Sequence, residues 1–220
     1  MSSTADVKKS SDIRSGGDRR IEIIDISTRM FLDHGFAGTS MSQLADACGI
    51  RKASFYHHFR SKDELFIQCV IKGYESALVR LAQLEQDDAL THDERVSHAL
   101  EVLYEVTVNS PAGKMSPLIA EVSRSMPELS ERFFNEYILL QRETLMKMVQ
   151  RGVGAGKFIE PDSDVFYHLV FGPIVTLSLS RAMFTTLPDL DVLFPTEKLK
   201  KGHCDAILAY LARPRNGTSG

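Results

Sequence analysis

The stretch from Lys52 to Phe59 combines side chains whose types and spacing are suited to contacting DNA. On a helix, Phe55 and Phe59 lie four positions apart on one face, where their rings can anchor the helix to a core. The opposite face is small and polar, and its members are Ala53, Ser54, Tyr56 and His57. Methyl groups pack against thymine, and polar groups hydrogen-bond to base edges or phosphates, so this face predicts a helix that enters the major groove.

The side chains of this face have different expected partners on DNA. Ala53 allows close approach to a base, whereas Lys52 and Ser54 are suited to base edges or phosphate oxygens. Tyr56 and His57 are expected to reach phosphates. A core helix with polar edges is the alternative for such a run taken alone, and the neighbouring motifs favour DNA contact.

Adjacent His57 and His58 do not predict a metal site. Neighbouring residues on a helix diverge by about 100°, and no third ligand lies within sequence reach. We expect His58 to be packed and hydrogen-bonded, and we expect no metal, cofactor or catalytic site in the chain.

Capping signals mark the helices that must position the DNA-facing residues. Ser40 with Gln43 and Ser61 with Glu64 each fit a capping box, and Gly49 supplies a turn between the first pair and the aromatic helix. This order predicts a helix-turn-helix. Helix N-termini also favour anions. The contacts predicted at these two helix starts are Thr39, Ser40, Ser42, Gln43 and Lys62.

The segment from about Arg19 to Leu65 resembles the DNA-binding domain of the TetR (tetracycline repressor) family. The resemblance is carried by Phe31, Gly35-Phe36, Thr39-Ser40-Met41, Leu44-Ala45, Gly49-Ile50, Phe55-Tyr56-His57-His58-Phe59 and Ser61-Lys62-Asp63-Glu64-Leu65. It implies a larger, sequence-divergent helical domain after this segment. It also implies a homodimeric regulator, commonly a repressor, whose affinity for DNA falls when a small molecule binds the C-terminal domain.

Two positions depart from the family pattern. Arg51 stands where relatives often have a serine before the aromatic helix, so the N-cap is lost and a cation is gained. We predict a phosphate contact for Arg51. Cys48 stands where a small residue is common, and we expect a packed thiol there rather than an exposed redox sensor.

Composition is that of a soluble folded protein with an uneven charge distribution. The 220 residues are 43% hydrophobic, and the formal net charge is −3. Residues 1–65 carry ten Lys and Arg against nine Asp and Glu, a net charge of +1, which leaves −4 for the rest. Three scattered cysteines predict neither a disulfide framework nor zinc binding. The N-terminus lacks the apolar core of a signal peptide, and the apolar run 169–179 is short for a bilayer, so we expect a cytoplasmic protein without membrane contact.

Start and stop signals predict an all-α chain of about nine helices and no strands. The expected domains are a flexible basic arm at 1–17, a helix-turn-helix DNA-binding domain at 18–65, a helical ligand-binding and dimerisation domain at 66–213, and a disordered tail at 214–220. Capping boxes are also expected at Thr91 with Glu94 and at Ser125 with Glu128, and Ser116 is expected to cap a helix whose first turn holds Pro117.

The second domain is expected to hold a dimer interface and an effector pocket. The helix between Pro161 and about Thr186 is apolar nearly all round, which requires burial on two sides, and the last helix has one apolar stripe. The predicted interface residues are Leu177, Arg181, Phe184, Leu199, His203, Ile207 and Tyr210. Chosen by residue type, the candidate pocket residues are Tyr104, Met115, Met126, Phe133, Phe134, Tyr137, Phe166, His168 and Phe171. A monomeric core without a pocket is the alternative for both sets.

These features predict a ligand-responsive regulator that binds a near-palindromic double-stranded DNA operator as a homodimer. A repressor released by a small apolar or aromatic effector is the first hypothesis. An effector-independent dimeric DNA-binding module, or an activator, is the second, and an enclosed apolar pocket would count against the module. A helical enzyme is a remote third, because the sequence has no Gly-rich phosphate loop, G-x-S-x-G, H-E-x-x-H or paired-carboxylate motif.

Overall fold

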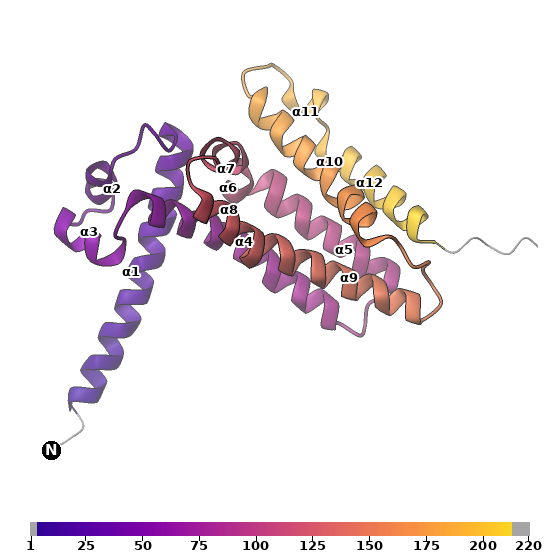
Figure 1. The fold of residues 1–220 in the computed structure, drawn as a ribbon, viewed down its shortest axis with the longest axis horizontal. Helices are drawn as coiled ribbons and strands as arrows, with labels where there is room; N and C mark the ends of the chain where they lie inside the picture. The colour runs from indigo at the N-terminus through magenta and orange to yellow at the C-terminus, as the bar shows by residue number, and fades with distance from the viewer. Residues whose placement is uncertain (1–3, 213–220) are drawn as a thin grey trace, which may run out of the picture.

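The computed structural model describes residues 4–212, with side chains from residue 18 onward, and it is helical throughout this range apart from connecting turns (Figure 1). Twelve α-helices and two π-helical segments are formed there, and a single isolated β-bridge joins Phe158 to Ala212. The predicted all-α class is confirmed. The number of elements exceeds nine because π-helical turns interrupt segments expected to be continuous helices, and because the short segments 111–114 and 190–193, expected as connections, are helical.

The N-terminal domain is built from three helices and the start of a fourth. These are α1 (Thr4–His34), α2 (Met41–Ala47), α3 (Lys52–His58) and α4 (Lys62–Gln86). Helix α1 begins well before the expected start at Asp18, because the segment contains no proline to interrupt the helix. The predicted flexible arm thus falls mostly within α1, whereas the predicted tail at 214–220 lies outside the described residues.

Local capping chemistry sets the boundaries of these helices. Ser40 forms a complete capping box with Gln43, and the Ser61 hydroxyl accepts the Glu64 amide at 3.0 Å. Gly35 ends the regular part of α1 and Gly49 makes the turn after α2, with φ of 72° and 65°, values that glycine adopts without steric cost. The helix-turn-helix geometry therefore follows from the sequence.

Two predicted caps are wrong. Ser116 is the first residue of α7 (Ser116–Val122) rather than its cap, and its hydroxyl lies 3.2 Å from the Tyr74 hydroxyl. The Ser125 hydroxyl donates backward to the Val122 carbonyl, while Met126 occupies the cap position before Pro127. In each case a proline lies in the first turn of the helix. Because proline has no amide hydrogen, this turn needs one capping hydrogen bond fewer, and the serine hydroxyl bonds to another partner.

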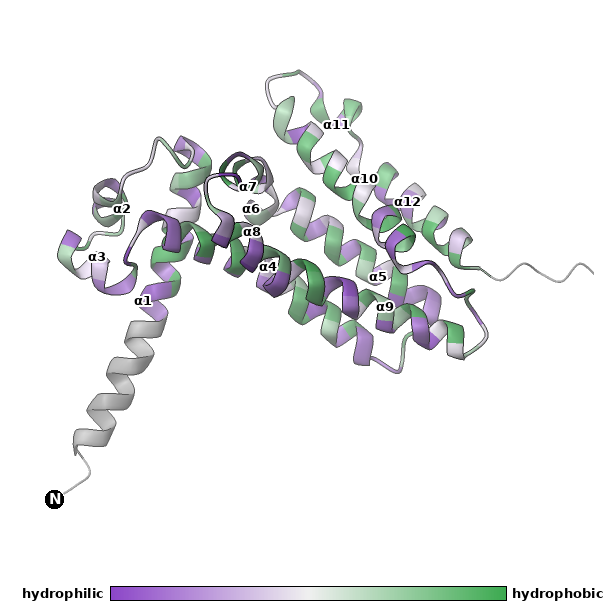
Figure 2. Cartoon of the chain, in the orientation of Figure 1, coloured by the Kyte–Doolittle hydropathy of each residue, from purple (hydrophilic) through white to green (hydrophobic). Residues whose placement is uncertain are grey.

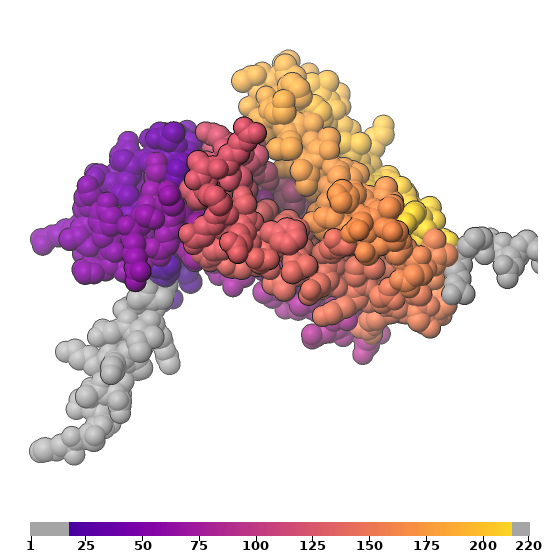
Figure 3. All heavy atoms as spheres, viewed as in Figure 1, coloured from indigo at the N-terminus to yellow at the C-terminus, as the bar shows by residue number. Residues whose placement is uncertain are grey.

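The C-terminal domain is a bundle around α4. Its remaining elements are α5 (His92–Tyr104), η1 (Glu105–Asn109), α6 (Pro111–Lys114), α7, α8 (Pro127–Phe133), η2 (Phe134–Ile138), α9 (Leu139–Gly154), α10 (Ser163–Met183), α11 (Leu190–Leu193) and α12 (Thr196–Leu211). Helix α4 runs from the N-terminal domain into this bundle and packs against α5 and α9. The N-terminal helices lie at one end of the molecule, and α10 to α12 lie away from them (Figure 3).

A proline and a histidine link α10 to α12. Pro173 lacks an amide hydrogen, so the Leu169 carbonyl four residues earlier loses its helical partner. The His203 Nε2 lies 2.9 Å from that carbonyl and its Nδ1 lies 3.0 Å from the Tyr104 hydroxyl. Because a carbonyl only accepts, Nε2 carries the proton and Nδ1 accepts from Tyr104. The carbonyl that Pro173 leaves without a helical partner thus accepts a hydrogen bond from a side chain of the neighbouring helix.

Helix α10 is long and apolar enough to cross a membrane by length and composition alone, although a third of its most apolar window is buried within the protein. Apolar residues occur on its inner and outer sides (Figure 2). The inner side contacts α5, α7 and α12. The outer apolar residues have no cover within the described chain.

Candidate DNA interface and effector cavity

Helix α3 presents the predicted groove face and buries its aromatic anchors. Phe55 and Phe59 are 0% exposed, and their ring centroids lie 6.3 Å apart. The opposite face is exposed, and it comprises Lys52, Ala53, Ser54, Tyr56 and His57. Burying two phenyl rings fixes a seven-residue helix that could not persist alone in water. The polar face is thus held rigidly outward.

Two arginines of α1 hydrogen-bond to the ends of α2 and α3. The Arg20 guanidinium lies 4.1 Å from the centroid of the Phe59 ring, and it donates to the His58 carbonyl. Arg19 donates to the Cys48 carbonyl at 2.6 Å. These bonds satisfy carbonyls at the ends of α2 and α3, so both cations act within the protein. Burial raises the pKa of the Cys48 thiol, which agrees with the expected packed cysteine.

Lys62 differs from its predicted role. Its ammonium donates to the Phe36 carbonyl at 2.8 Å and lies 4.2 Å from the centroid of the Phe36 ring. The side chain therefore points back to the turn between α1 and α2. There the ammonium is attracted by the Phe36 carbonyl and by the negative face of the Phe36 ring. The structure thus gives Lys62 an internal partner in place of the phosphate.

Thr39 is also directed inward. It is 2% exposed, and its hydroxyl donates to the Gly35 carbonyl at 2.8 Å. This carbonyl lies at the frayed end of α1 and needs a donor. The predicted phosphate contact by the Thr39 side chain is therefore contradicted in this conformation.

The remaining predicted contacts stay accessible. Ser40 and Gln43 are exposed although they cap α2 with each other, and Ser42 is half-buried on the same helix. Arg51 occupies the cap position of α3 and makes no side-chain capping bond, as the sequence predicted. The side chains of Arg51 and Lys52 form no ion pair or hydrogen bond with any described residue. Both cations are thus available to phosphates.

A small apolar cavity lies inside the C-terminal domain. Its volume is about 220 Å³, and seven elements contribute to it: α4, α7 to α10 and both π-helical segments. Its lining residues are Tyr74, Thr107, Ser116, Ile119, Ala120, Phe133, Tyr137, Ile138, Gln141, Phe171, Val175 and Leu179. None of them carries a formal charge. The cavity is smaller than the sites that enclose drug-sized molecules, which begin at about 300 Å³.

Three aromatic rings form one wall of the cavity. The Tyr74 ring centroid lies 4.5 Å from that of Tyr137 and 5.2 Å from that of Phe133. Burial raises the pKa of the Tyr74 hydroxyl to about 12, and burial also raises the pKa of Tyr137. Both phenols are therefore neutral at physiological pH and act as hydrogen-bonding groups.

The structure separates the pocket residues predicted by type. Phe133, Tyr137 and Phe171 line the cavity. Four others are buried in the core without lining it, because their helices turn them toward different neighbours: Tyr104, Met115, Met126 and Phe166. Phe134 is 54% exposed and His168 is also exposed, since both lie on outer helix faces. Sequence reasoning missed Gln141, whose isolated polar position in an apolar helix face was its only signal.

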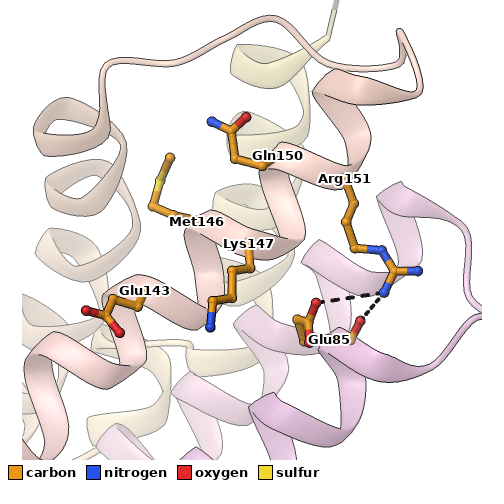
Figure 4. Close-up of a pocket in the computed structure, with 6 residues that line it drawn as sticks. All are labelled: Glu85, Glu143, Met146, Lys147, Gln150 and Arg151. Carbon is orange, nitrogen blue, oxygen red and sulfur yellow. Dashed lines mark hydrogen bonds and ion pairs between the residues drawn. The ribbon is translucent and has the colours of Figure 1, made fainter.

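Two further hollows lie on the surface. One, on the outer side of α9, has a charged rim in which Arg151 points to Glu85 of α4 (Figure 4). The other is a groove of about 750 Å³ between α1 and α10, with Asp33 on one wall and Arg181 on the other. Both have charged residues in their lining, unlike the apolar cavity beneath α10.

The predicted dimer residues divide between core and surface. Leu177 and Ile207 are buried within the chain, which removes them from any contact with a second protomer. Arg181 is engaged by the Phe194 carbonyl and Asp191, and His203 by Tyr104 and Leu169. Phe184 and Leu199 are exposed, and Tyr210 is half-buried.

The DNA-binding segment has clear relatives among known proteins. Residues 23–69 match the family model of bacterial regulatory proteins of the tetR family. The HTH-type transcriptional repressor KstR2 of Mycolicibacterium smegmatis is 28% identical over 148 residues, which cover 67% of this chain and 70% of that protein. This segment belongs to the TetR family. The motif at α2 and α3 thus sits in the segment that defines the family.

Solved structures of TetR-family proteins share the whole fold. A TetR transcriptional regulator from Chloroflexus aurantiacus superposes with a TM-score of 0.73 at 22% identity, covering 91% of this chain and all of that one. The regulator FadR of Bacillus subtilis, solved with stearoyl-CoA, gives 0.66 at 17% identity and covers 87% and 98% of the two chains. At these identities the likeness establishes the two-domain fold and leaves ligand and operator to be argued from this chain.

Proposed function

We propose that this TetR-family regulator is a ligand-responsive repressor that binds a near-palindromic operator as a homodimer in the cytoplasm. The observation that carries the proposal is the rigid, outward-facing surface of α3, held by buried Phe55 and Phe59. The related KstR2 proteins are transcriptional repressors, which supports regulation rather than catalysis. The groove contacts we assign are Ala53 and Ser54. The phosphate contacts we assign are Ser40, Ser42, Gln43, Arg51, Lys52, Tyr56 and His57.

The dimer would form through the outer faces of α10 and α12. Met183 is 72% exposed at the end of α10, and Leu199 is exposed on α12. Gly202 and Ala206, three and seven residues after Leu199, continue this face of α12 with small exposed residues, which allow close helix approach. An uncovered two-helix apolar face of this kind fits a symmetric helical contact. We therefore keep Phe184, Leu199 and Tyr210 in the interface and leave Leu177 and Ile207 to the core.

Helix α4 joins the cavity to the DNA-binding domain. Its first turn is capped by Ser61 beside α3, and three turns later it places Tyr74 in the cavity wall. Helix α6 touches both α1 and α4, and a Cβ on Gly73 would come within 2.7 Å of the Ala112 Cβ. Because this contact has no spare room, a ligand that displaces Tyr74 would move α4 relative to α1. Such a movement would change the spacing of the two α3 helices in the dimer.

Selection from a pool of random double-stranded DNA tests the proposal. We expect enrichment of a two-fold symmetric site whose half-sites lie about one helical turn apart. Enrichment of no sequence, or of a single unrepeated half-site, would contradict it. The effector-independent module stays as the second candidate, and the apolar cavity favours the ligand-responsive repressor over it.

A further inference from the structure

We infer that the cavity binds a small, uncharged and largely apolar molecule through a hydrogen bond that the ligand donates to Gln141. The inference rests on the proposed function and specifies the chemistry of its ligand. Its starting observation is that Gln141 is 0% exposed, lies on the cavity wall, and has an amide oxygen, Oε1, without a hydrogen-bond partner among the described residues.

The other end of the Gln141 amide is already engaged. Its Nε2 donates to the Tyr137 hydroxyl at 2.6 Å, and in this orientation Oε1 is the end of the amide that has no partner among the described residues. Leaving a buried acceptor unmatched costs about 1–3 kcal/mol. A ligand that supplies a donor to Oε1 removes this cost. Donor-bearing ligands are therefore favoured over apolar molecules of the same shape.

Two other polar groups of the wall, the hydroxyls of Tyr74 and Ser116, do not compete for this role. The Tyr74 and Ser116 hydroxyls lie 3.2 Å apart and form a hydrogen bond with each other. The neutral phenols and the lack of charged lining residues leave nothing to balance an ionised group on the ligand. A carboxylate or ammonium would lose its hydration without a counter-ion. The buried part of the ligand is thus neutral.

Two structural features support a site that accommodates ligands. Both π-helical segments line the cavity, η1 through Thr107 and η2 through Tyr137 and Ile138. A π-turn inserts an extra residue into a helix at a cost in stability and is frequent at functional sites. Because two of them face one small apolar space, the local packing is adjusted around this cavity. With about 220 Å³ available, the space suits a single substituted ring or a short branched chain.

The experiment compares three probes of nearly equal shape: 4-methylphenol, which donates and accepts, 4-methylanisole, which only accepts, and p-xylene, which does neither. Binding to the full-length protein is measured by calorimetry and by chemical shifts of the Gln141 side-chain amide. We expect 4-methylphenol to bind about tenfold more tightly than either other probe, as one hydrogen bond to a buried acceptor implies. Gln141→Met, which keeps the volume, should reduce the preference to about onefold, whereas Gln150→Met, on the exposed side of the same helix and outside the cavity, should retain it.

Three results would overturn the inference. They are equal binding of all three probes, a preference for 4-methylanisole, and an unchanged preference in Gln141→Met. Failure of every probe to bind up to its solubility limit would overturn it as well. Release of operator DNA is measured separately. If 4-methylphenol binds with the expected preference but leaves DNA bound, the ligand chemistry stands and the proposed ligand response of the repressor fails.

Discussion

Lys52 and Lys62 form a matched pair that separates DNA contact from internal bracing. Each is the first residue of a helix, α3 and α4 respectively. Lys52 is exposed without a described partner, whereas Lys62 donates to the Phe36 carbonyl at 2.8 Å and lies over the Phe36 ring. We predict that Lys62→Met reduces protein stability and that Lys52→Met reduces electrostatic binding to DNA.

The magnitude for Lys62→Met follows from its contacts. A hydrogen bond from a charged donor contributes about 1.5–3 kcal/mol, and a partly exposed cation–π contact adds about 0.5–1 kcal/mol. Two effects oppose this loss and stabilise the variant. Removing a cation from a helix N-terminus stabilises the fold by about 0.3–1 kcal/mol, and side-chain entropy that the ordered lysine loses on folding contributes up to about 1.5–2 kcal/mol. The free energy of unfolding should therefore fall by about 1 kcal/mol. At a urea slope of about 2–3 kcal/mol/M, the midpoint moves down by roughly 0.4 M.

Urea unfolding and DNA binding as a function of salt give the two readouts, at a fixed protein concentration because the protein is expected to dimerise. Lys62→Met should keep the dependence of log K on log salt, while Lys52→Met should flatten it by about one unit per protomer and leave stability within about 0.5 kcal/mol. A flattened salt dependence with unchanged stability in Lys62→Met would refute the bracing role. The phosphate contact that the sequence predicts for Lys62 would then be the better account.

Three further perturbations test other parts of the molecule. In competition binding, Ser54→Ala should abolish the preference at one base pair of each half-site and lower the affinity for the preferred site by about three- to tenfold. An unchanged preference would show that Ser54 does not belong to the groove face. Ala206→Arg should give a monomer in sedimentation and lose operator binding, while Lys201→Ala on the flank of α12 should stay dimeric; a dimeric Ala206→Arg would place the interface elsewhere. Burial lowers the pKa of His203 below 6.5, so the unfolded chain takes up its proton first and stability should fall as pH drops below 6.5, by at most about 1.4 kcal/mol per pH unit. His203→Gln should flatten that part of the unfolding profile, and an unaltered profile would show that another group titrates.

The DNA-binding helices could be predicted because their signals are local. Ser40, Gly49 and Ser61 act within one turn of their own position, and the spacing of Phe55 and Phe59 fixes which side of α3 is buried. The groove face then follows by exclusion. The directions of the Lys62 and Thr39 side chains could not be predicted in the same way. Their partners, Phe36 and Gly35, become near neighbours only when the turn between α1 and α2 folds.

The cavity could not be predicted, because its walls come from segments between residues 74 and 179. Residue type selected Phe133, Tyr137 and Phe171, which line the cavity, and it selected Met115 and Phe166 for the same reason although they fill the core. Which side of a helix faces an unfilled space depends on packing between helices, and packing has no signal in hydropathy. The π-helical turns at Thr107 and Tyr137 likewise arise from tertiary packing.

Helix α12 supplies the hydrogen bond that a proline removes from α10. Pro173 removes one helical hydrogen bond from α10, and the carbonyl it frees accepts from His203. The sequence placed His203 in a dimer interface, but its two ring nitrogens bond within the chain. A polar residue in an apolar stripe thus marks a specific partner more securely than it marks an interface.

Hydroxyl-radical footprinting of the protein on its selected DNA site tests the central claim most directly. If the exposed face of α3 enters the major groove in a symmetric dimer, two protected regions about one helical turn apart should appear. Both should vanish together in Ala206→Arg. One continuous protected region, or protection that persists in the monomeric variant, would contradict the account.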